Sequence, residues 1–421
     1  MYTNILIKNN NIMEKKNNNY HNNINNINNN NDNNKKYHKR NFSPNPEEIK
    51  NKLNHTLQTN GEITRNIIFE AEQISYKHYP SKSIDYDDFG FLKKYSKQSL
   101  NNILNNNEIE VEKSNKRLIK WIKMLNNFSE FKLNHYSKLK SRVRKGIPDS
   151  MRSTVWPILA GIDKLRKKDL YKSLVESLEK ENKTNNCNDE EVIICDLHRT
   201  FPKHYLFMEK LGEGQRALYR VLTCYSLYNK NTGYVQGMGF LTAVFLTYMN
   251  EENSFWMLDS LMKNYNMESL YMKNFPGLRK TMYVFLCLLK KFFPKCYELL
   301  KNNKVYPTMY AWQWFITLYS CVLEFKILVR IFDCVFLEGF KIIYRVALGI
   351  FKVKESELLK KRNFEHIMDF FKDFTNDIDK EVLLKECFKI SFSRKDIKKY
   401  EEIYINNINN NKDEVMILVN F

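Results

Sequence analysis

The sequence predicts an all-α protein built around one multi-helical domain. Apolar residues recur at three- and four-residue steps in successive segments of residues 117–355, as on one face of a helix. No strand-like alternation and no repeated unit interrupts this pattern. The chain has 421 residues and is 43% hydrophobic, so it can bury a large core.

Changes in composition divide the chain into four parts. Residues 1–60 are rich in Asn and Lys and poor in apolar side chains, so we predict disorder, because little burial offsets the ordering entropy. Residues 61–116 are a poorly defined linker, to which we assign no function even though it contains an acidic turn at Asp85–Gly90. Residues 117–355 form the domain, and residues 356–421 form a charged helical extension and tail. The apolar run near the start is too short for a signal peptide.

Helical periodicity predicts the elements of the domain in order. A lead-in helix begins at Arg117, and a second helix follows the Gly146–Asp149 turn, with Asp149 or Ser150 as its cap, and ends at Gly161. Further helices are expected at residues 164–180, 215–227, 238–248, 255–262 and 278–293. The apolar run at 309–325 is too short and too polar to span a membrane, so we predict a buried helix there.

A first candidate site residue is Arg199, in the stretch Ile193–Pro202. Asp196 precedes it by three residues, so the two side chains share a helix face and the carboxylate can brace the guanidinium. Pro202 disfavours the α region at Phe201, which places Arg199 in the last turn before the chain leaves the helix. The alternative is an exposed ion pair worth only about 0.2 to 0.5 kcal/mol.

A second candidate is Gln236, in the run Gly233-Tyr234-Val235-Gln236-Gly237-Met238. Gly233 and Gly237 permit a sharp turn and a close approach by a partner. An apolar segment of helical length follows, so Gln236 is expected at or near a helix N-terminus, where anions are favoured. The alternative is a loop glutamine whose glycines serve only the turn. We group Asp196, Tyr234, Gly233 and Gly237 as residues that support the two candidates.

Three further residues are interpreted as scaffold. Arg152 and Trp156 lie one helical turn apart among apolar residues, so Arg152 is expected to form a pair inside the domain. Asp333 lies in an apolar helix, where an unpaired carboxylate would be costly, so we expect it to be buried and paired.

The net charge of +19 and the pI near 9.3 do not by themselves identify a partner. Lys and Arg are spread along the chain without a nucleic-acid-binding motif, so we do not predict nucleic-acid binding. A basic surface also suits an anionic membrane or an acidic protein. No phosphate-binding loop pattern of Gly, Lys and Ser or Thr occurs, so a nucleotide site of its own is not expected.

The eight cysteines lack the spacing of a metal site. No Cys-x-x-Cys pair occurs and no histidine stands at ligand spacing, so we expect no metal and interpret the cysteines as reduced thiols of a cytosolic protein. Cys195 and His198 could form a nucleophile pair, but no third group is evident to orient the histidine.

Five ordered motifs resemble the TBC domain family of Rab GTPase-activating proteins, over about half of the chain. They are the Arg-x-Gly-Ile-Pro run to Trp156, the Ile-x-x-Asp-x-x-Arg-Thr-Phe-Pro run at 193–202, the Gly-Tyr-Val-Gln-Gly-Met run at 233–238, Tyr306–Phe315 and Arg330–Gly339. The sequence departs from the family at Phe332, where the family usually has Trp, which concerns packing.

The resemblance implies a mechanism with two fingers, in which Arg199 matches the family's catalytic arginine and Gln236 its catalytic glutamine. It implies a GTP-bound Rab-type GTPase as the partner, which carries the GTP and Mg²⁺, so that the chain needs no cofactor of its own. It also implies a role in vesicle trafficking and a place in the cytoplasm or, as a peripheral protein, at the surface of endomembranes. The alternative is a catalytically silent scaffold that binds a GTP-loaded Rab.

Overall fold

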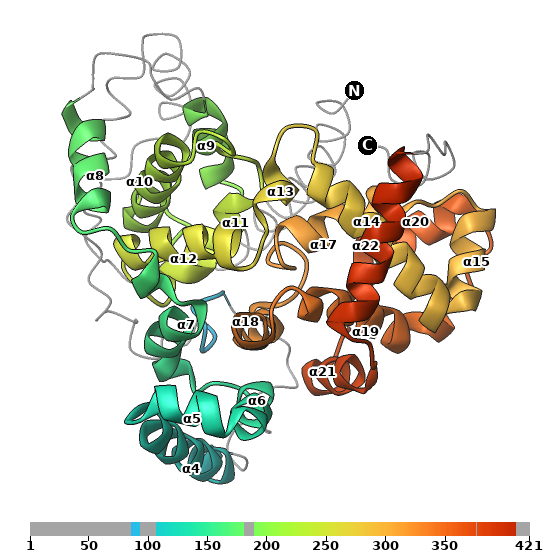
Figure 1. The fold of residues 1–421 in the computed structure, drawn as a ribbon, viewed down its shortest axis with the longest axis horizontal. Coiled ribbons are helices and arrows are strands. Elements are labelled where there is room, and N and C mark those ends of the chain that lie inside the picture. The colour runs from blue at the N-terminus through green and yellow to red at the C-terminus, as the bar shows by residue number, and fades with distance from the viewer. Residues whose placement is uncertain (1–85, 93–106, 181–188, 376, 410–421) are drawn as a thin grey trace, which may run out of the picture. The chain divides into compact units, whose positions relative to one another are not determined.

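A computed structural model of the chain describes residues 86–92, 107–180, 189–375 and 377–409, with the backbone alone for 107–115 (Figure 1). The described residues form α-helices, two short 3₁₀ turns and two isolated β-bridges, and they contain no strand. The predicted all-α fold is therefore confirmed. Residues 1–60, for which disorder is predicted, and residues 410–421 of the predicted tail lie outside the described residues.

The first half of the domain contains helices α4 to α12. Their bounds are α4 Asn107–Leu125, α5 Phe128–Asn134, α6 Tyr136–Lys145, η1 Asp149–Met151, α7 Arg152–Ala160, η2 Ile162–Lys164, α8 Leu170–Lys180, α9 Glu190–Leu197, α10 Glu213–Tyr228, α11 Met238–Leu246 and α12 Glu251–Asn264. Helices α10, α11 and α12 pack against one another, and α9 contacts α10 and α11. Nearly every residue of α11 is buried, because its sequence is apolar on all sides.

The second half contains helices α13 to α22. Their bounds are α13 Glu268–Tyr271, α14 Pro276–Phe292, α15 Pro294–Asn302, α16 Pro307–Tyr310, α17 Trp312–Ile316, α18 Phe325–Glu338, α19 Lys341–Leu358, α20 Phe364–Asp373, α21 Lys380–Lys389 and α22 Arg394–Asn409. Helix α18 contacts α6, α7 and α19, and so connects the two halves. The charged extension packs back on the domain, because α21 lies against α19 and α22 lies against α14 (Figure 1).

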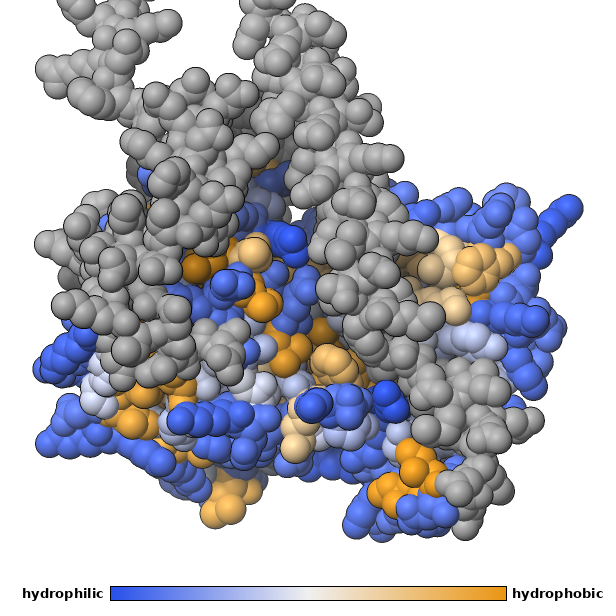
Figure 2. Space-filling model, turned by 90° about the horizontal axis from the view of Figure 1, so that it is seen from above, coloured by the Kyte–Doolittle hydropathy of each residue, from blue (hydrophilic) through white to orange (hydrophobic). Residues whose placement is uncertain are grey.

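Buried ion pairs complement the apolar core. Arg220 of α10 donates two hydrogen bonds to Glu251 of α12, at 2.9 and 2.6 Å, and Tyr171 of α8 donates a third at 2.8 Å. These bonds compensate the carboxylate for lost water. On the face in Figure 2, hydrophilic residues predominate among the coloured atoms, and apolar residues form separate groups between them.

Several predicted elements differ from the structure. The lead-in helix begins at Asn107 rather than at Arg117, and neither Asp149 nor Ser150 caps α7, whose N-cap is Met151 without a side-chain bond. The helix expected at 164–180 begins only at Leu170, because Asp169 has a positive φ of 57°. The helix expected at 278–293 spans Pro276–Phe292, and Pro294 begins the next helix, α15.

The predicted buried helix at 309–325 is wrong. This run divides into the end of α16, the short α17 and a series of turns before α18. Leu318 and Tyr319 have φ values of 47° and 69°, which a right-handed helix excludes. Both side chains are fully buried, and the Tyr319 hydroxyl donates to the carbonyl of Ile343 at 2.9 Å, so tertiary packing outweighs local helix preference. None of the helices within the described residues has the length and apolar character to cross a membrane.

Candidate functional site

Arg199 lies in the turn directly after α9. The helix ends at Leu197, and the backbone N–H of Arg199 and the hydroxyl of Thr200 both donate to the carbonyl of Asp196, at 3.1 and 2.9 Å. These two bonds satisfy a carbonyl that the end of the helix leaves without a helical partner. Arg199 therefore stands two residues beyond the helix rather than inside its last turn, and 47% of its side chain is exposed.

An aromatic anchor fixes the chain just after Arg199. Phe201 has a φ of 45°, and its buried ring packs against other rings. Its ring neighbours are Phe91, Phe207, Phe240 and Phe325, with centroids 5.6 to 6.4 Å away. The cost of the left-handed backbone is offset by this burial. The result is a short loop whose base is rigid and whose arginine reaches solvent.

Asp196 braces Arg199 without immobilising it. Its Oδ1 lies 3.7 Å from Nη1 of Arg199, which is an ion-pair distance and too long for a hydrogen bond. Its Oδ2 accepts a hydrogen bond of 2.7 Å from the hydroxyl of Tyr234. Burial raises the pKa of Asp196, and the Tyr234 bond and the Arg199 charge oppose that rise. Burial, followed by the charge of Asp196, raises the pKa of Tyr234, so this hydroxyl remains a donor.

Gln236 lies in the loop between α10 and α11, two residues before the first residue of α11. This agrees with its expected place near a helix N-terminus, and the residue is half-buried. The two flanking glycines have φ values of 60° at Gly233 and 109° at Gly237, which L side chains rarely adopt. A Cβ at Gly233 would also lie 2.6 Å from Oδ2 of Asp189, the atom that accepts a 2.6 Å hydrogen bond from the Tyr234 N–H.

The structure brings the Arg199 and Gln236 segments together. Tyr234, two residues before Gln236, bonds to Asp196, three residues before Arg199. A Cβ at Gly239, in the first turn of α11, would lie 3.1 Å from the hydroxyl of Thr200, so the two segments also pack closely. We call Arg199, Gln236, Asp196 and Tyr234 the finger site, after the role that the family resemblance implies for Arg199 and Gln236.

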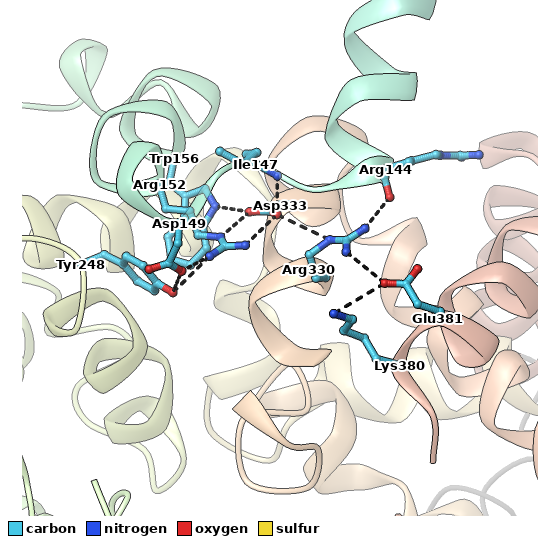
Figure 3. Close-up of polar contacts among 10 residues, drawn as sticks. All are labelled: Arg144, Ile147, Asp149, Arg152, Trp156, Tyr248, Arg330, Asp333, Lys380 and Glu381. Atoms are coloured by element: carbon cyan, nitrogen blue, oxygen red, sulfur yellow. Dashed lines mark hydrogen bonds and ion pairs between the residues drawn. The ribbon is translucent and has the colours of Figure 1, made fainter. Parts of the chain in front are cut away.

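The three scaffold residues form a separate buried network (Figure 3). Asp333 of α18 accepts hydrogen bonds from Nε of Arg152 at 3.1 Å, from Nε1 of Trp156 at 2.8 Å and from the N–H of Ile147 at 3.0 Å. Burial alone lowers the pKa of Arg152, but Asp333, Tyr248 and Asp149 together outweigh it, so the pKa is raised. This network attaches the first turn of helix α7 to helix α18. Phe332 is fully buried against Trp156, so the packing position next to Asp333 is filled.

Residues 86–92, which the sequence left without a role, pack beside the finger site. Phe91 forms an antiparallel bridge with His204, the Leu92 N–H donates to the carbonyl of Lys203 at 3.1 Å, and the Tyr205 N–H donates to the carbonyl of Gly90 at 2.9 Å. This short segment therefore supports the loop that follows Arg199. The available signal was the pair Phe89 and Phe91 around Gly90, which is unusual in a polar stretch.

The titratable groups near this loop do not form a metal or nucleophile site. No group of three or more His, Cys, Asp or Glu residues suited to a metal ion is found within the described residues. Burial, and then the charge of Lys210, lowers the pKa of His198. Cys195 is a free, exposed cysteine, and the side chain that hydrogen-bonds to His198 is the amide of Gln215.

Comparisons with known proteins identify the domain. The family model described as the Rab-GTPase-TBC domain matches residues 149–359. The GTPase-activating protein GYP5 of Saccharomyces cerevisiae is 31% identical over 76% of this chain and 33% of its own length. The growth hormone-regulated TBC protein 1 of Xenopus tropicalis is 34% identical over 62% of this chain and 75% of its own length.

Solved structures agree on the fold. The Chlamydomonas flagellar RabGAP TBC domain superposes with a TM-score of 0.55 and 24% identity, covering 72% of this chain and 99% of that domain. The Ypt/Rab-GAP domain of Gyp1p gives a TM-score of 0.53 at 18% identity, covering 69% of this chain and 99% of that domain. The chain spans about a third or less of the length of the first three curated relatives, at 33%, 35% and 22%.

Proposed function

Because the chain belongs to the Rab-GTPase-TBC domain family, we propose that it is a GTPase-activating protein for a Rab-type small GTPase. In this proposal, Arg199 and Gln236 enter the partner's active site and complete it in trans. The partner is bound in its GTP form and carries both GTP and Mg²⁺. The chain contributes side chains and positions them, and it binds no nucleotide itself.

The observation that carries the proposal is the bond between Tyr234 and Asp196, which joins the Arg199 segment to the Gln236 segment. Two catalytic groups act together only when the protein holds them at a fixed separation, since a small misplacement can cost a large factor in rate. Here the separation depends on two helices, α9 and α11, that pack directly against each other. Arg199 is also half exposed, so it can reach a partner.

An arginine suits the first of the two tasks. Phosphoryl transfer develops negative charge on the γ-phosphate oxygens and on the bridging oxygen, and an arginine finger in trans increases the rate by about 10³ to 10⁵. This corresponds to roughly 4 to 7 kcal/mol of activation free energy. The planar guanidinium donates to two oxygens at once, which a lysine ammonium cannot do in a fixed geometry.

A glutamine suits the second task. Its carboxamide can accept a hydrogen bond from the attacking water through oxygen and donate to phosphate through nitrogen. Gln236 is half-buried, and the positive φ of Gly233 and of Gly237 sets the sharp turn that carries it, with the chain's own atoms packed against both glycines. In the family's scheme this amide replaces the glutamine of the GTPase.

The cellular role follows from the partner class. A protein that returns a Rab to its GDP form regulates vesicle trafficking, and it acts in the cytoplasm and at the surface of endomembranes. The net charge of +19 is compatible with a peripheral contact to an anionic leaflet.

The test mixes the full-length chain with a panel of GTP-loaded Rab proteins and measures phosphate release in single turnovers. We expect stimulation of at least one Rab. Arg199→Ala and Gln236→Ala should each lose most of the stimulation while they retain the circular dichroism and unfolding temperature of the wild type. Arg362→Ala serves as the matched control, because Arg362 is an exposed arginine outside the finger site.

The same experiment separates activation from scaffolding. Binding of GTP-loaded Rabs without any increase in phosphate release would favour the silent scaffold. Unchanged stimulation by either finger variant would show that the assignment of that residue is wrong.

A further inference from the structure

The loop of residues 199–208 carries Arg199, and its backbone is tied to a distant part of the chain at one place. Several of its backbone hydrogen bonds are internal, such as that from the Phe207 N–H to the carbonyl of His204 at 2.9 Å. Within the described ranges, both backbone–backbone hydrogen bonds that join this loop to a distant part of the sequence go to residues 86–92. We call residues 86–92 the clamp segment.

Side chains reinforce the antiparallel bridge between the clamp segment and the loop. Nε2 of the buried His204 lies 2.9 Å from the carbonyl oxygen of Phe89. The ring of Phe91 packs against those of His204 and Phe201, with centroids 4.8 and 5.6 Å away. Phe201 is two residues from Arg199, so the clamp segment contacts the backbone that carries this guanidinium.

The clamp segment has a defined shape of its own. Oδ1 of Asp87 accepts hydrogen bonds from the N–H groups of Phe89 and Phe91, both at 2.9 Å, and the Asp87 N–H donates to the carbonyl of Phe91 at 2.8 Å. Gly90 has a φ of 86°, and a Cβ there would lie 2.5 Å from the ring of Tyr205. An aspartate that closes a turn and a glycine at positive φ are typical of a tight, fixed conformation.

The clamp segment also packs on the scaffold of the domain. The rings of Phe89 and Phe91 lie 5.7 and 5.2 Å from that of Phe325, the first residue of α18. Figure 1 shows the segment beside α18. Helix α18 is itself held by the buried network around Asp333. The segment therefore connects the loop that carries Arg199 to the most rigid part of the domain.

We propose that the clamp segment is a positioning element for the arginine finger. This inference rests on the proposed function, because that function gives Arg199 its catalytic task. A finger acts only when its guanidinium reaches the transferred phosphoryl group in the correct geometry, and a displacement of about 1 Å can lower a rate about 100-fold. Residues that hold a catalytic side chain from behind supply this accuracy.

The loop does not depend on the clamp segment for its existence. Without the segment, Phe201 keeps its ring contacts with Phe207, Phe240 and Phe325. Its backbone loses the two long-range hydrogen bonds and the wall formed by Phe91. We therefore expect a folded protein in which the Arg199 loop samples more conformations, rather than an unfolded domain.

The proposal places part of the catalytic unit outside the family match. The match begins at residue 149, and helical periodicity in the sequence starts the domain at residue 117. The clamp segment precedes both positions. A fragment that starts at the lead-in helix would keep Arg199 and Gln236 and would lose the support of the arginine.

The alternative is that the clamp segment only covers the buried side of the loop. Loss of a cover lowers stability and lowers the rate and the partner affinity together, because less folded protein is present. Loss of a positioning element lowers the maximal rate and leaves the affinity for the ground state unchanged, because the finger acts mainly in the transition state. The two roles are therefore distinguishable by kinetics.

The variant Gly90→Ala displaces the clamp segment without changing the loop. The new Cβ would lie 2.5 Å from Tyr205 and 2.9 Å from His204, so the segment must move. Gly161→Ala is the matched control, because Gly161 has a φ of 69° and the nearest atom to its Cβ is 3.8 Å away. It introduces a similar backbone strain without displacing a neighbour. Both variants keep every residue of the finger site.

The first measurement is amide hydrogen exchange of the full-length chain without a partner. In Gly90→Ala we expect residues 203–208 to exchange at least about tenfold faster than in the wild type, because the Tyr205 N–H loses its acceptor. Exchange in α11 should not change. Gly161→Ala should match the wild type in both regions. This measurement does not depend on the proposed function.

The second measurement is single-turnover phosphate release from a GTP-loaded Rab that the wild type stimulates, over a range of chain concentrations. The maximal rate of Gly90→Ala should be about 10- to 100-fold lower, with the half-maximal concentration within about twofold of the wild type. Affinity for the same Rab bound to GDP and aluminium fluoride, a mimic of the transition state, should fall by the same factor as the maximal rate. Gly161→Ala should match the wild type.

A milder second variant covers the case in which Gly90→Ala does not fold. Phe91→Leu keeps the backbone bonds to the loop and an apolar side chain, and it removes the ring that packs on Phe201. It should change exchange and maximal rate in the same direction by smaller factors.

Three outcomes overturn the proposal. They are unchanged exchange in residues 203–208, faster exchange with an unchanged maximal rate, and an equal loss of maximal rate and ground-state affinity. If the wild type stimulates no Rab, the proposed function fails, and the exchange result still decides whether the clamp segment orders the loop.

Discussion

The domain contains two pairs of arginine and aspartate that have the same chemistry and opposite environments. Arg152 and Asp333 lie 3.1 Å apart with side chains 5% and 0% exposed, and Asp333 also accepts from Trp156 and Ile147. Arg199 and Asp196 lie 3.7 Å apart, and the arginine side chain is 47% exposed. In the first pair, the N–H groups of Arg152 bond to partners inside the protein. In the second pair, most N–H groups of Arg199 remain available to a partner.

This difference separates an arginine that holds a fold from one that can serve a partner. A buried pair is expensive to form from solvated ions, and it is even more expensive to break on one side. The half-exposed Arg199 can exchange its ion pair for water at small cost, because the buried Asp196 carboxylate keeps the hydrogen bond from Tyr234. Residue type alone therefore does not distinguish the two roles, and burial together with the number of bonds does.

The largest expected effect concerns Arg199→Lys. This change keeps the charge but removes the planar fork, so we expect the stimulated rate of phosphate release to fall about 10³-fold. The unfolding temperature should stay within experimental error of the wild type, because the Arg199 side chain is half exposed and lysine keeps its charge beside Asp196. Single-turnover kinetics and thermal unfolding of the same preparation provide the two readings. Retained stimulation would show that charge alone suffices at this position.

The converse experiment is Asp333→Asn. It leaves Arg152 charged and buried without its counter-ion, so we expect the free energy of unfolding to fall by about 3 kcal/mol. The matched change Asp196→Asn should cost about 1 kcal/mol or less, since Arg199 can turn to solvent and the new amide oxygen can still accept from Tyr234. Urea unfolding measures both. Equal losses would contradict the contrast between the two pairs.

A third experiment tests whether the buried loop that follows the exposed Arg199 contributes to the stability of the fold. His204, five residues after Arg199, is buried, its Nε2 donates to the carbonyl of Phe89 at 2.9 Å, and its Nδ1 accepts from the Leu206 N–H at 3.1 Å. Protonation at Nδ1 would place two N–H groups against each other. Burial lowers the pKa of His204 from 6.5 to about 4, although the bond to Phe89 opposes the shift.

The sign of the pH effect follows from this depressed pKa. The unfolded chain binds the proton between pH 6.5 and 4 and the folded chain does not, so stability is present above this window and is lost as the pH falls through it. Between pH 7 and 5 the His204 contribution should fall by about 2 kcal/mol. Urea midpoints at both pH values should show a smaller loss in His204→Gln than in the wild type. The lowered pKa of His198 acts in both proteins and cancels.

The sequence predicts contacts between residues that are close along the chain, and it does not predict contacts between residues that are far apart along it. The brace between Asp196 and Arg199 and the place of Gln236 before a helix follow from spacings of a few residues, and the structure has both. The bond from Tyr234 to Asp196 joins residues 38 positions apart, and no local pattern indicates it. The same holds for the contacts of residues 86–92 with His204, which lies more than a hundred positions away.

The broken helix at 309–325 has a related cause. Its composition favours a helix, but the buried hydroxyl of Tyr319 has its acceptor on α19, and the backbone adopts a left-handed turn at this residue. Local propensity is worth a few tenths of a kcal/mol per residue, whereas burial of a large aromatic side chain is worth several times more. Wherever a single tertiary contact outweighs a turn of helix, periodicity predicts the wrong element.

The smallest expected effect concerns Tyr234→Phe, which tests the link within the finger site. Without the hydroxyl, Asp196 loses the hydrogen bond at Oδ2, and its carboxylate should draw Arg199 closer and away from the partner. We expect stimulated phosphate release to fall about tenfold, or about 1.4 kcal/mol. Tyr171→Phe removes an equivalent bond to Glu251 in the core, so it should cost similar stability without this loss of rate. If both variants lose the same amount of activity, the bond from Tyr234 matters only for folding, and the two segments are positioned by packing alone.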